Sequence, residues 1–155
     1  MSLQIVVLAV GKMKERHYRE AEAEYSKRLQ AFASLVVEEV PDEPDDRAER
    51  GMTLEGTRVL ERIRERDQVI ALDARGKRFT SEGFAAHLEE RFARGASRYV
   101  FVIGGSRGLD RRVKERADLL LSFSDFTFPH QLMRVILLEQ LYRAFQILRG
   151  AKYHK

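Results

Sequence analysis

Five apolar runs recur along the chain at intervals that leave room for a helix between one run and the next. They cover residues 4–10, 35–40, 68–73, 99–103 and 119–123. Most of these runs are apolar at consecutive positions, so both faces of each predicted strand would be buried. Strands of this kind are typical of a parallel sheet that is covered by helices on both sides. The pattern therefore predicts an α/β fold in which a parallel sheet is flanked by helices.

Helical patterns fill the intervals between the apolar runs. Residues 14–32 and about 47–66 are rich in Ala, Glu, Arg and Leu. A third helix is expected to start at a Thr80 or Ser81 cap and to run to about Ala93, before Gly95 ends it. We find no internal repeat, and we interpret the acidic, Pro-containing stretch 38–50 as a loop. The sequence therefore predicts one domain over residues 1–155.

The last helix, from Pro129 to about Arg149, is apolar around most of its circumference. A helix that is apolar on nearly every side needs more than one neighbour, which favours a subunit interface. Glu139, Arg143 and Gln146 form its one polar stripe, at i, i+4 and i+7. The stripe is either an exposed helical ion pair, which contributes about a few tenths of a kcal/mol, or a polar line that faces a ligand.

The composition is that of a globular chain with a basic excess. Of 155 residues, 44% are hydrophobic and 34% are charged. There is no cysteine, which excludes disulfides, thiolate zinc sites and cysteine nucleophiles. The formal charge is +4, but residues 38–50 carry seven acidic and two basic side chains, which leaves +9 for the rest of the chain. That excess indicates either a polyanionic partner such as RNA or a merely soluble basic protein.

The sequence shows no membrane-spanning run and no export signal. No apolar run approaches the roughly 18 residues that span a bilayer. The first residues lack the basic start and the small-residue cleavage site of an export signal. We therefore expect no membrane partner and a cytoplasmic location.

The first candidate ligand site follows the fourth predicted strand. The segment FVIGGSRGLD places Gly104, Gly105 and Gly108 between this strand and a short helical stretch. Ligands of open parallel sheets bind at the carboxyl ends of strands, where glycine lets a backbone come close. The spacing differs from the dinucleotide fingerprint G-x-G-x-x-G. The segment is therefore either a nucleotide pocket of another kind or a tight turn without a ligand.

Two further strand ends are candidates for binding. The segment ALDARGKRF continues from Asp73 into Arg75, Lys77 and Arg78, which either grip phosphates or form a solvated turn. The segment FSDFTFPHQ places three phenylalanines directly before the last helix. Their rings either form the wall of an adenine-binding site or pack into the core. The four histidines form no ligand-spaced pair, so we expect no metal.

Several of these segments together resemble a known family. FVIGGSRGL, LSFSDFTFPHQLMRVILLEQLYRAF and the final YHK occur in this order in a short chain. They closely resemble the bacterial ribosomal large-subunit methyltransferase H family, which belongs to the SPOUT class of methyltransferases. The resemblance extends through VLAVGKMKERHY and ALDARGK, so it covers nearly the whole chain. It is weakest over residues 45–66.

The resemblance implies an activity, a detail of the fold and partners. Members of the family transfer a methyl group from S-adenosylmethionine to N3 of a pseudouridine in the helix 69 loop of 23S ribosomal RNA (23S rRNA), within the assembled 70S ribosome. The class has a trefoil knot near the C-terminus, an exception to the rule that chains do not thread their own loops. It also implies a homodimer, in which the tail of one subunit completes the pocket of the other.

The resemblance also assigns candidate site residues. The cofactor pocket corresponds to Leu72, Gly104, Phe123, Ser124, Asp125, Phe126, Thr127 and Phe128. The substrate side corresponds to Glu139, Arg143, Tyr153 and His154. We expect His154 or Glu139 to accept a proton from the target ring, and Arg143 to stabilise the developing oxyanion.

Other classes of protein stay open at this point. A non-catalytic ribosome- or RNA-binding module would bind ribosomes without binding a cofactor. A small nucleotide-dependent oxidoreductase would use the glycine segment, although the dinucleotide fingerprint is missing. A metal enzyme is the weakest alternative, because the histidines lack ligand spacing.

Overall fold

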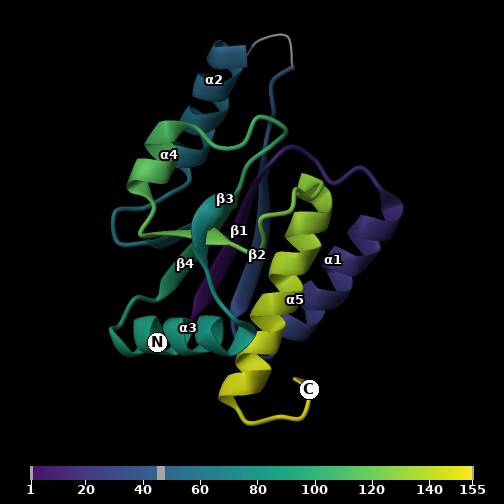
Figure 1. Ribbon diagram of the computed structural model, residues 1–155, viewed down its shortest axis with the longest axis vertical. Coiled ribbons are helices and arrows are strands. Elements are labelled where there is room, and N and C mark those ends of the chain that lie inside the picture. Colours follow the sequence, from purple (N-terminus) through teal and green to yellow (C-terminus); the bar gives the residue numbers. More distant parts are fainter. Residues whose placement is uncertain (1, 45–47, 155) are drawn as a thin grey trace.

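Strands and helices alternate along the computed structural model, which describes residues 2–44 and 48–154 (Figure 1). The elements are β1 (Gln4–Val10), α1 (Arg16–Leu29), β2 (Ser34–Val40), α2 (Ala48–Glu61), β3 (Gln68–Arg78), α3 (Ser81–Ala93), β4 (Arg98–Ile103), α4 (Arg111–Arg116), β5 (Leu119–Ser122) and α5 (His130–Leu148). The strands form one sheet in the order β2-β1-β4-β3-β5, and all neighbours are parallel. The predicted α/β fold with a parallel sheet is confirmed.

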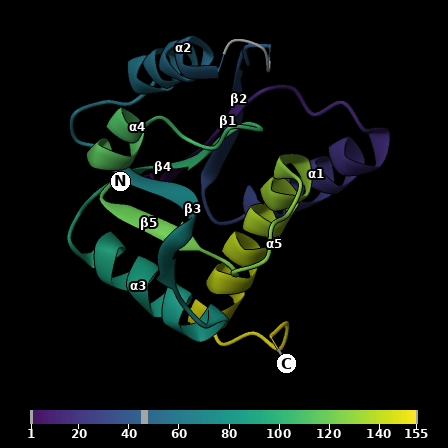
Figure 2. The same cartoon turned by 45° about the horizontal axis from the view of Figure 1, so that its top comes forward.

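Helices cover both faces of the sheet, which explains why every residue of β1 after Gln4 is apolar. Helices α1, α3 and α5 lie on one face, and α2 and α4 lie on the other (Figure 2). Along β1, Ile5 and Val7 point into the core under α1, α3 and α5, whereas Val6 and Leu8 point into the core under α2 and α4. Successive side chains of a strand point to opposite faces, so burial on both faces needs an apolar residue at every position.

The third strand is longer than the sequence pattern predicts. The predicted strand ends at residue 73 and continues into a loop, but β3 runs to Arg78. Its pairing with β5 shifts between Leu72 and Lys77, so the residues in between bulge out of the ladder. A Cβ atom on Gly76 would lie 2.5 Å from the carbonyl oxygen of Leu120, so only glycine lets the two backbones pass this closely.

Helix α3 has the predicted limits. Helices α1 and α5 are shorter than predicted at both ends, and α2 ends earlier than predicted. The Thr80 side chain accepts a hydrogen bond from the backbone N–H of Gly83 at 3.0 Å, as expected of an N-cap. Gly95 follows the helix with a φ of 93°, in the left-handed region. The first two helices were predicted over residues 14–32 and about 47–66, and Arg47 lies outside the described residues.

Helix α5 buries one side of its apolar surface within the same chain. It packs against α1 and α3, and Leu137, Leu138 and Leu141 are fully buried. The Phe145 ring stacks on that of Phe32, in the turn that follows α1, with 5.1 Å between ring centroids. Other apolar side chains of this helix, such as Leu132 and Ile136, are only partly buried, and the subunit interface stays a prediction, as does the trefoil knot.

A buried arginine fixes the start of α5 to the first loop of the chain. Arg134 is 1% exposed, and its guanidinium donates hydrogen bonds to Glu39 at 2.6 Å, Glu22 at 3.2 Å and the carbonyl of Gly11 at 3.3 Å. The Glu39 carboxylate also accepts a bond from the backbone N–H of Met13 at 2.9 Å. Arg134 therefore joins β2, α1, the β1–α1 loop and α5 through one charged group.

Candidate functional site

The carboxyl ends of β3, β4 and β5 surround a cavity of about 190 Å³, which we call the glycine cavity. These three strands are neighbours in the sheet, so the bulge of β3 and the loops that follow β4 and β5 meet at one edge. Seven of the eight predicted cofactor residues line the cavity, and they are Leu72, Gly104, Phe123, Ser124, Phe126, Thr127 and Phe128. The structure thus brings together segments that are up to 56 positions apart in the chain.

Backbone atoms form one wall of the glycine cavity. Gly105 and Gly108 pair in an antiparallel bridge, in which the N–H of Gly108 donates to the carbonyl of Gly105 at 3.0 Å. A Cβ atom on Gly104 would lie 2.6 Å from the backbone of Gly108, and Gly108 itself has a φ of 82°. Both positions therefore require glycine, and the turn presents main chain to the cavity.

Asp73 adds a negative charge to the rim of the glycine cavity. Its carboxylate accepts a hydrogen bond from the backbone N–H of Arg75 at 3.0 Å and pairs with Lys114 at 3.0 Å. These two partners, the backbone bond first, hold the pKa of Asp73 below its ordinary value. Asp73 is thus ionised at neutral pH. The sequence indicates Asp73 only as the end of a strand, although a carboxylate after a parallel strand is a common partner for ribose hydroxyls.

Asp125 is the predicted cofactor residue whose side chain lies elsewhere. Its carboxylate pairs with Arg78 at 2.6 Å, and both side chains are exposed. The neighbouring cation of the ALDARGKRF segment, Lys77, lies over the ring of Phe79 at 4.8 Å. The loop that contains Asp125 still borders the cavity through Ser124 and Phe126, and Phe126 is 79% exposed.

The predicted substrate residues Glu139, Arg143, Tyr153 and His154 form one hydrogen-bonded group, which we call the tail cluster. Arg143 donates to Glu139 at 2.7 Å, and the Tyr153 hydroxyl donates to the same carboxylate oxygen at 2.8 Å. The guanidinium also lies over the Tyr153 ring, 4.9 Å from its centroid. The Glu139 and Arg143 side chains are 19% and 24% exposed, so this is not the exposed helical ion pair that the sequence left open. Gln146, the third residue of the stripe, is buried.

The hydrogen bonds of the tail cluster keep Tyr153 and Arg143 protonated and determine which nitrogen of the His154 ring accepts. Burial, together with the bond to Glu139, raises the pKa of Tyr153 to about 12. The bond to Glu139 also raises the pKa of Arg143, so both groups keep their protons at neutral pH. Arg143 Nη1 lies 3.0 Å from His154 Nδ1, and arginine can only donate, so this nitrogen accepts. The proton of the neutral ring is therefore on Nε2, which faces Glu82.

Glu82 is a member of this site that the sequence did not indicate. It lies in the first turn of α3, and its carboxylate accepts the hydrogen bond from His154 Nε2. That bond is the main cause that lowers the pKa of Glu82 below its ordinary value. A glutamate in the first turn of a helix is common because it suits the helix dipole, so nothing in the local pattern connects Glu82 with a residue 72 positions later.

A further cavity lies between the glycine cavity and the tail cluster, and we call it the Gln140 cavity. It has a volume of about 220 Å³ and shares Leu121, Ser122, Phe123 and Phe128 with the glycine cavity. Gln140 lines its other side and donates a hydrogen bond from Nε2 to Glu139 at 2.9 Å. None of the four residues of the tail cluster lines the glycine cavity of its own chain.

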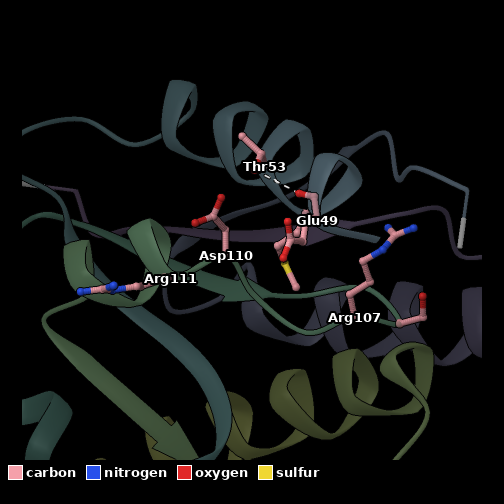
Figure 3. A pocket seen from close by; sticks show the side chains of 7 residues that line it. Glu49, Thr53, Arg107, Asp110 and Arg111 are labelled. Atoms are coloured by element: carbon pink, nitrogen blue, oxygen red, sulfur yellow. Dashed lines mark hydrogen bonds between the residues drawn. The ribbon is translucent and has the colours of Figure 1, made fainter. Parts of the chain in front are cut away.

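A wider cavity, of about 800 Å³, lies on the other side of the glycine turn, beneath α2 (Figure 3). Three of its charged side chains, Arg107, Asp110 and Arg111, have partners within the chain. Arg107 pairs with Glu55 at 2.9 Å, and Asp110 caps α4 and pairs with Arg112. Figure 3 shows the Arg111 side chain pointing away from Glu49 and Thr53. The cavity is wide and open, and it does not bring together groups for a reaction, so the glycine cavity remains the candidate site.

Residues 2–44 and 48–154 contain no group of three or more His, Asp or Glu side chains that could hold a metal ion. Within the same ranges, no helix has the length and apolar character needed to cross a membrane.

Comparison with known proteins gives the class. The family described as predicted SPOUT methyltransferase matches residues 3–154, so the chain belongs to the SPOUT methyltransferase family. The fold is similar to a solved structure described as a probable methylase family protein from Haemophilus influenzae Rd KW20, with a TM-score of 0.51 and 14% sequence identity. That match covers 99% of this chain and 70% of the other chain. The chain is thus a methyltransferase by family.

Proposed function

We propose that this chain is an S-adenosylmethionine-dependent methyltransferase that acts on N3 of a pseudouridine in the helix 69 loop of 23S rRNA, within the assembled 70S ribosome. The observation that carries the proposal is that seven predicted cofactor residues, from three separate segments, line one cavity at the carboxyl edge of the sheet. A ribosomal substrate also implies that the protein works in the cytoplasm.

The residues of the glycine cavity fit S-adenosylmethionine. The main chain of the glycine turn leaves room for a close ligand, and Leu72, Phe123 and Phe128 offer apolar surface to an adenine ring. The ionised carboxylate of Asp73 suits ribose hydroxyls. When bound, the cofactor would supply a methyl group that its sulfonium charge makes electrophilic.

The tail cluster supplies the groups that the target ring needs. N3 of the ring loses a proton as it gains the methyl group, and the developing charge on the ring needs a cation. Arg143 is charged and can stabilise that charge, whereas Tyr153 keeps its proton because its pKa is about 12. Glu139 and His154 Nδ1 are the acceptors, and both now accept bonds from Arg143. Rearrangement of Arg143 toward the ring would free either of them to take the proton.

A homodimer would complete the site. The glycine cavity of one chain holds about 190 Å³, whereas ligand pockets typically hold about 300–1,000 Å³. The tail cluster does not line that cavity in the same chain. A second copy that covers the open side with its body would enlarge the pocket, and its tail would bring the substrate groups to the cofactor.

Calorimetry with S-adenosylmethionine, combined with two variants, tests the proposal. Gly104→Ala should abolish binding of the cofactor, because the new Cβ atom collides with the Gly108 backbone. In Gly83→Ala the new Cβ atom would meet only side-chain atoms, Thr80 Oγ1 at 3.1 Å and Phe79 Cδ1 at 3.8 Å, so this variant should bind normally. Truncation after Arg149 should keep cofactor binding and the fold but lose methyl transfer to ribosomes.

A non-catalytic ribosome-binding module is the alternative, and its basis is the charge of +9 outside residues 38–50. Such a module would bind 70S ribosomes, with an affinity that falls steeply as salt rises, but would bind no S-adenosylmethionine. Cofactor binding by the unmodified chain would exclude it.

A further inference from the structure

Arg107 lies at the tip of the glycine turn, residues 104–108, and its side chain leaves the turn on the side away from the glycine cavity. The bridge between Gly105 and Gly108 makes Arg107 one of the two central residues of this turn. Figure 3 shows its side chain directed from the turn toward α2, where it lines the wider cavity. The glycines of the turn line the glycine cavity, but Arg107 does not. Any effect of Arg107 on a cofactor would therefore act through the turn.

The Arg107 guanidinium joins the turn to two other segments of the chain. It pairs with the carboxylate of Glu55 on α2 at 2.9 Å. It also donates hydrogen bonds to the carbonyl oxygens of Glu43, at 3.2 Å, and of Pro44, both in the loop that follows β2. The same oxygen of Glu55 accepts a bond from the backbone N–H of Glu43 at 2.8 Å. The turn, α2 and the loop after β2 thus share one hydrogen-bonded group.

This ion pair is buried, which makes its geometry specific. The side chains of Arg107 and Glu55 are only 11% and 5% exposed. A buried charge is costly unless it is paired and hydrogen-bonded, so the pair strongly disfavours positions of the turn that separate the two groups. A guanidinium also presents its donors in a rigid plane, so it restricts direction as well as distance. The position of the turn is therefore held more closely than apolar contacts would hold it.

A second link joins α2 to the chain just after the turn. Asp110 caps α4 and pairs with Arg112 at 2.8 Å. The Arg112 guanidinium donates to the carbonyl oxygen of Thr53 at 2.9 Å and to the hydroxyl of Thr57 at 3.1 Å, both on α2. This link holds the start of α4, whereas Arg107 holds the turn itself, next to the glycines of the cavity wall.

We propose that Arg107 and Glu55 are positioning residues for the cofactor, because their ion pair holds the glycine turn in the shape in which its main chain meets S-adenosylmethionine. This inference rests on the proposed function of the glycine cavity. Three of the five residues 104–108 are glycines, and glycine loses more conformational freedom on ordering than any other residue. A binding loop that is already ordered binds more tightly, because the ligand does not have to supply the ordering free energy. The ion pair supplies this order from outside the cavity.

Calorimetry with S-adenosylmethionine separates positioning from a merely structural role. Arg107→Met removes the guanidinium and should weaken cofactor binding about tenfold, the loss expected for one charge-assisted hydrogen bond. The control is Arg98→Met, because Arg98 pairs with Asp67 at the opposite end of β4 and the two side chains are similarly buried, at 12% and 3% exposed. Both variants should lose stability in urea denaturation, but Arg98→Met should bind the cofactor with the affinity of the unmodified chain.

A conservative variant tests the directional part of the inference. Arg107→Lys keeps a positive charge beside Glu55 but lacks the planar group that reaches both carbonyl oxygens of the loop. Its affinity for S-adenosylmethionine should fall about threefold, between those of the unmodified chain and Arg107→Met. If Arg107→Met fails to fold, the Arg107→Lys result decides: weaker binding supports the inference, and normal binding overturns it.

The possible outcomes separate this inference from the proposed function. Normal cofactor affinity in Arg107→Met overturns the positioning role and leaves the cofactor site intact. Equal losses of affinity in Arg107→Met and Arg98→Met also overturn it, because the ion pair would then act only through the general stability of the fold. No cofactor binding by the unmodified chain would overturn the proposed function and the positioning role together.

Discussion

His154 in the C-terminal tail donates a hydrogen bond to Glu82 in the first turn of α3. The other nitrogen of its ring accepts a bond from Arg143 on α5 at 3.0 Å. Two helices thus hold the imidazole in one tautomer, and the segment from Gly150 to His154 is attached to the body of the protein. A basic nitrogen on a chain end is a poor catalyst unless something fixes its position.

Removal of the Glu82 carboxylate should release the tail. In Glu82→Ala, carboxypeptidase should trim the C-terminal residues faster, while the melting temperature of the domain changes little because the pair lies at the surface. Glu89→Ala, an exposed position on the same helix, should be trimmed like the unmodified chain. Equal trimming rates for Glu82→Ala and the unmodified chain would show that Glu82 does not hold the tail.

Low pH should release the tail in the same way. The bond to His154 holds the pKa of Glu82 below its ordinary 4.5. A carboxyl whose pKa is lowered in the folded chain contributes fully above about pH 4.5, and the contribution disappears as the pH falls through the folded value. The trimming rate of the unmodified chain should therefore rise below about pH 4.5 toward that of Glu82→Ala, measured with an acid-stable carboxypeptidase.

Tyr153 should make the stability of the protein depend on pH in the alkaline range. Its pKa is raised from the ordinary 10.0 to about 12 by burial and by the bond to Glu139. A phenol of this kind stabilises the fold fully below about pH 10 and loses that contribution as the pH rises toward about 12. Tyr153→Phe should therefore be less stable than the unmodified chain at about pH 8, and the difference should shrink between pH 10 and 12. A difference that stays constant in urea denaturation across this range would contradict the hydrogen bond.

Arg134 should be a major contributor to stability. Arg134→Ala leaves the carboxylates of Glu22 and Glu39 close together without their shared cation. Loss of one partner of a buried ion pair costs about 3–5 kcal/mol. The free energy of unfolding, measured by urea denaturation, should fall by about that amount, whereas Arg66→Ala in the α2–β3 loop should change it by less than about 0.5 kcal/mol. A loss below about 1 kcal/mol for Arg134→Ala would mean that the group is dispensable.

Gly76 should tolerate no side chain. In Gly76→Ala the new Cβ atom would lie 2.5 Å from the Leu120 carbonyl, and this neighbour is backbone that cannot rotate away. Overpacking of this kind costs about 1–3 kcal/mol, and the displaced strand also forms part of the glycine cavity. Stability and cofactor affinity should fall together. Unchanged values of both would show that β3 and β5 separate easily at this point.

Local sequence patterns predicted those strands and helices whose limits depend on residues close together in the sequence. The strand over residues 4–10 and the helix capped by Thr80 were predicted with their observed limits, because continuous apolarity and an N-cap are local signals. The extension of β3 was missed because residues 73–78 are mostly polar and include Gly76. This composition is typical of a turn. Its strand character comes from pairing with β5, a contact between distant segments.

The same distinction applies to the candidate site. The predicted cofactor residues came from strand ends and from a family resemblance, and most of them surround one cavity. Glu82 was missed because its importance depends on which side of α3 faces the tail. The position of α3 relative to the tail is set by core packing, so the sequence around Glu82 does not indicate it.

Transfer of labelled methyl groups from S-adenosylmethionine to 70S ribosomes, 50S subunits and naked 23S rRNA, all lacking the modification, tests the central claim most directly. We predict incorporation into 70S ribosomes alone, at one site per 23S rRNA, with loss of incorporation in the chain truncated after Arg149. No incorporation into any of the three substrates would contradict the account.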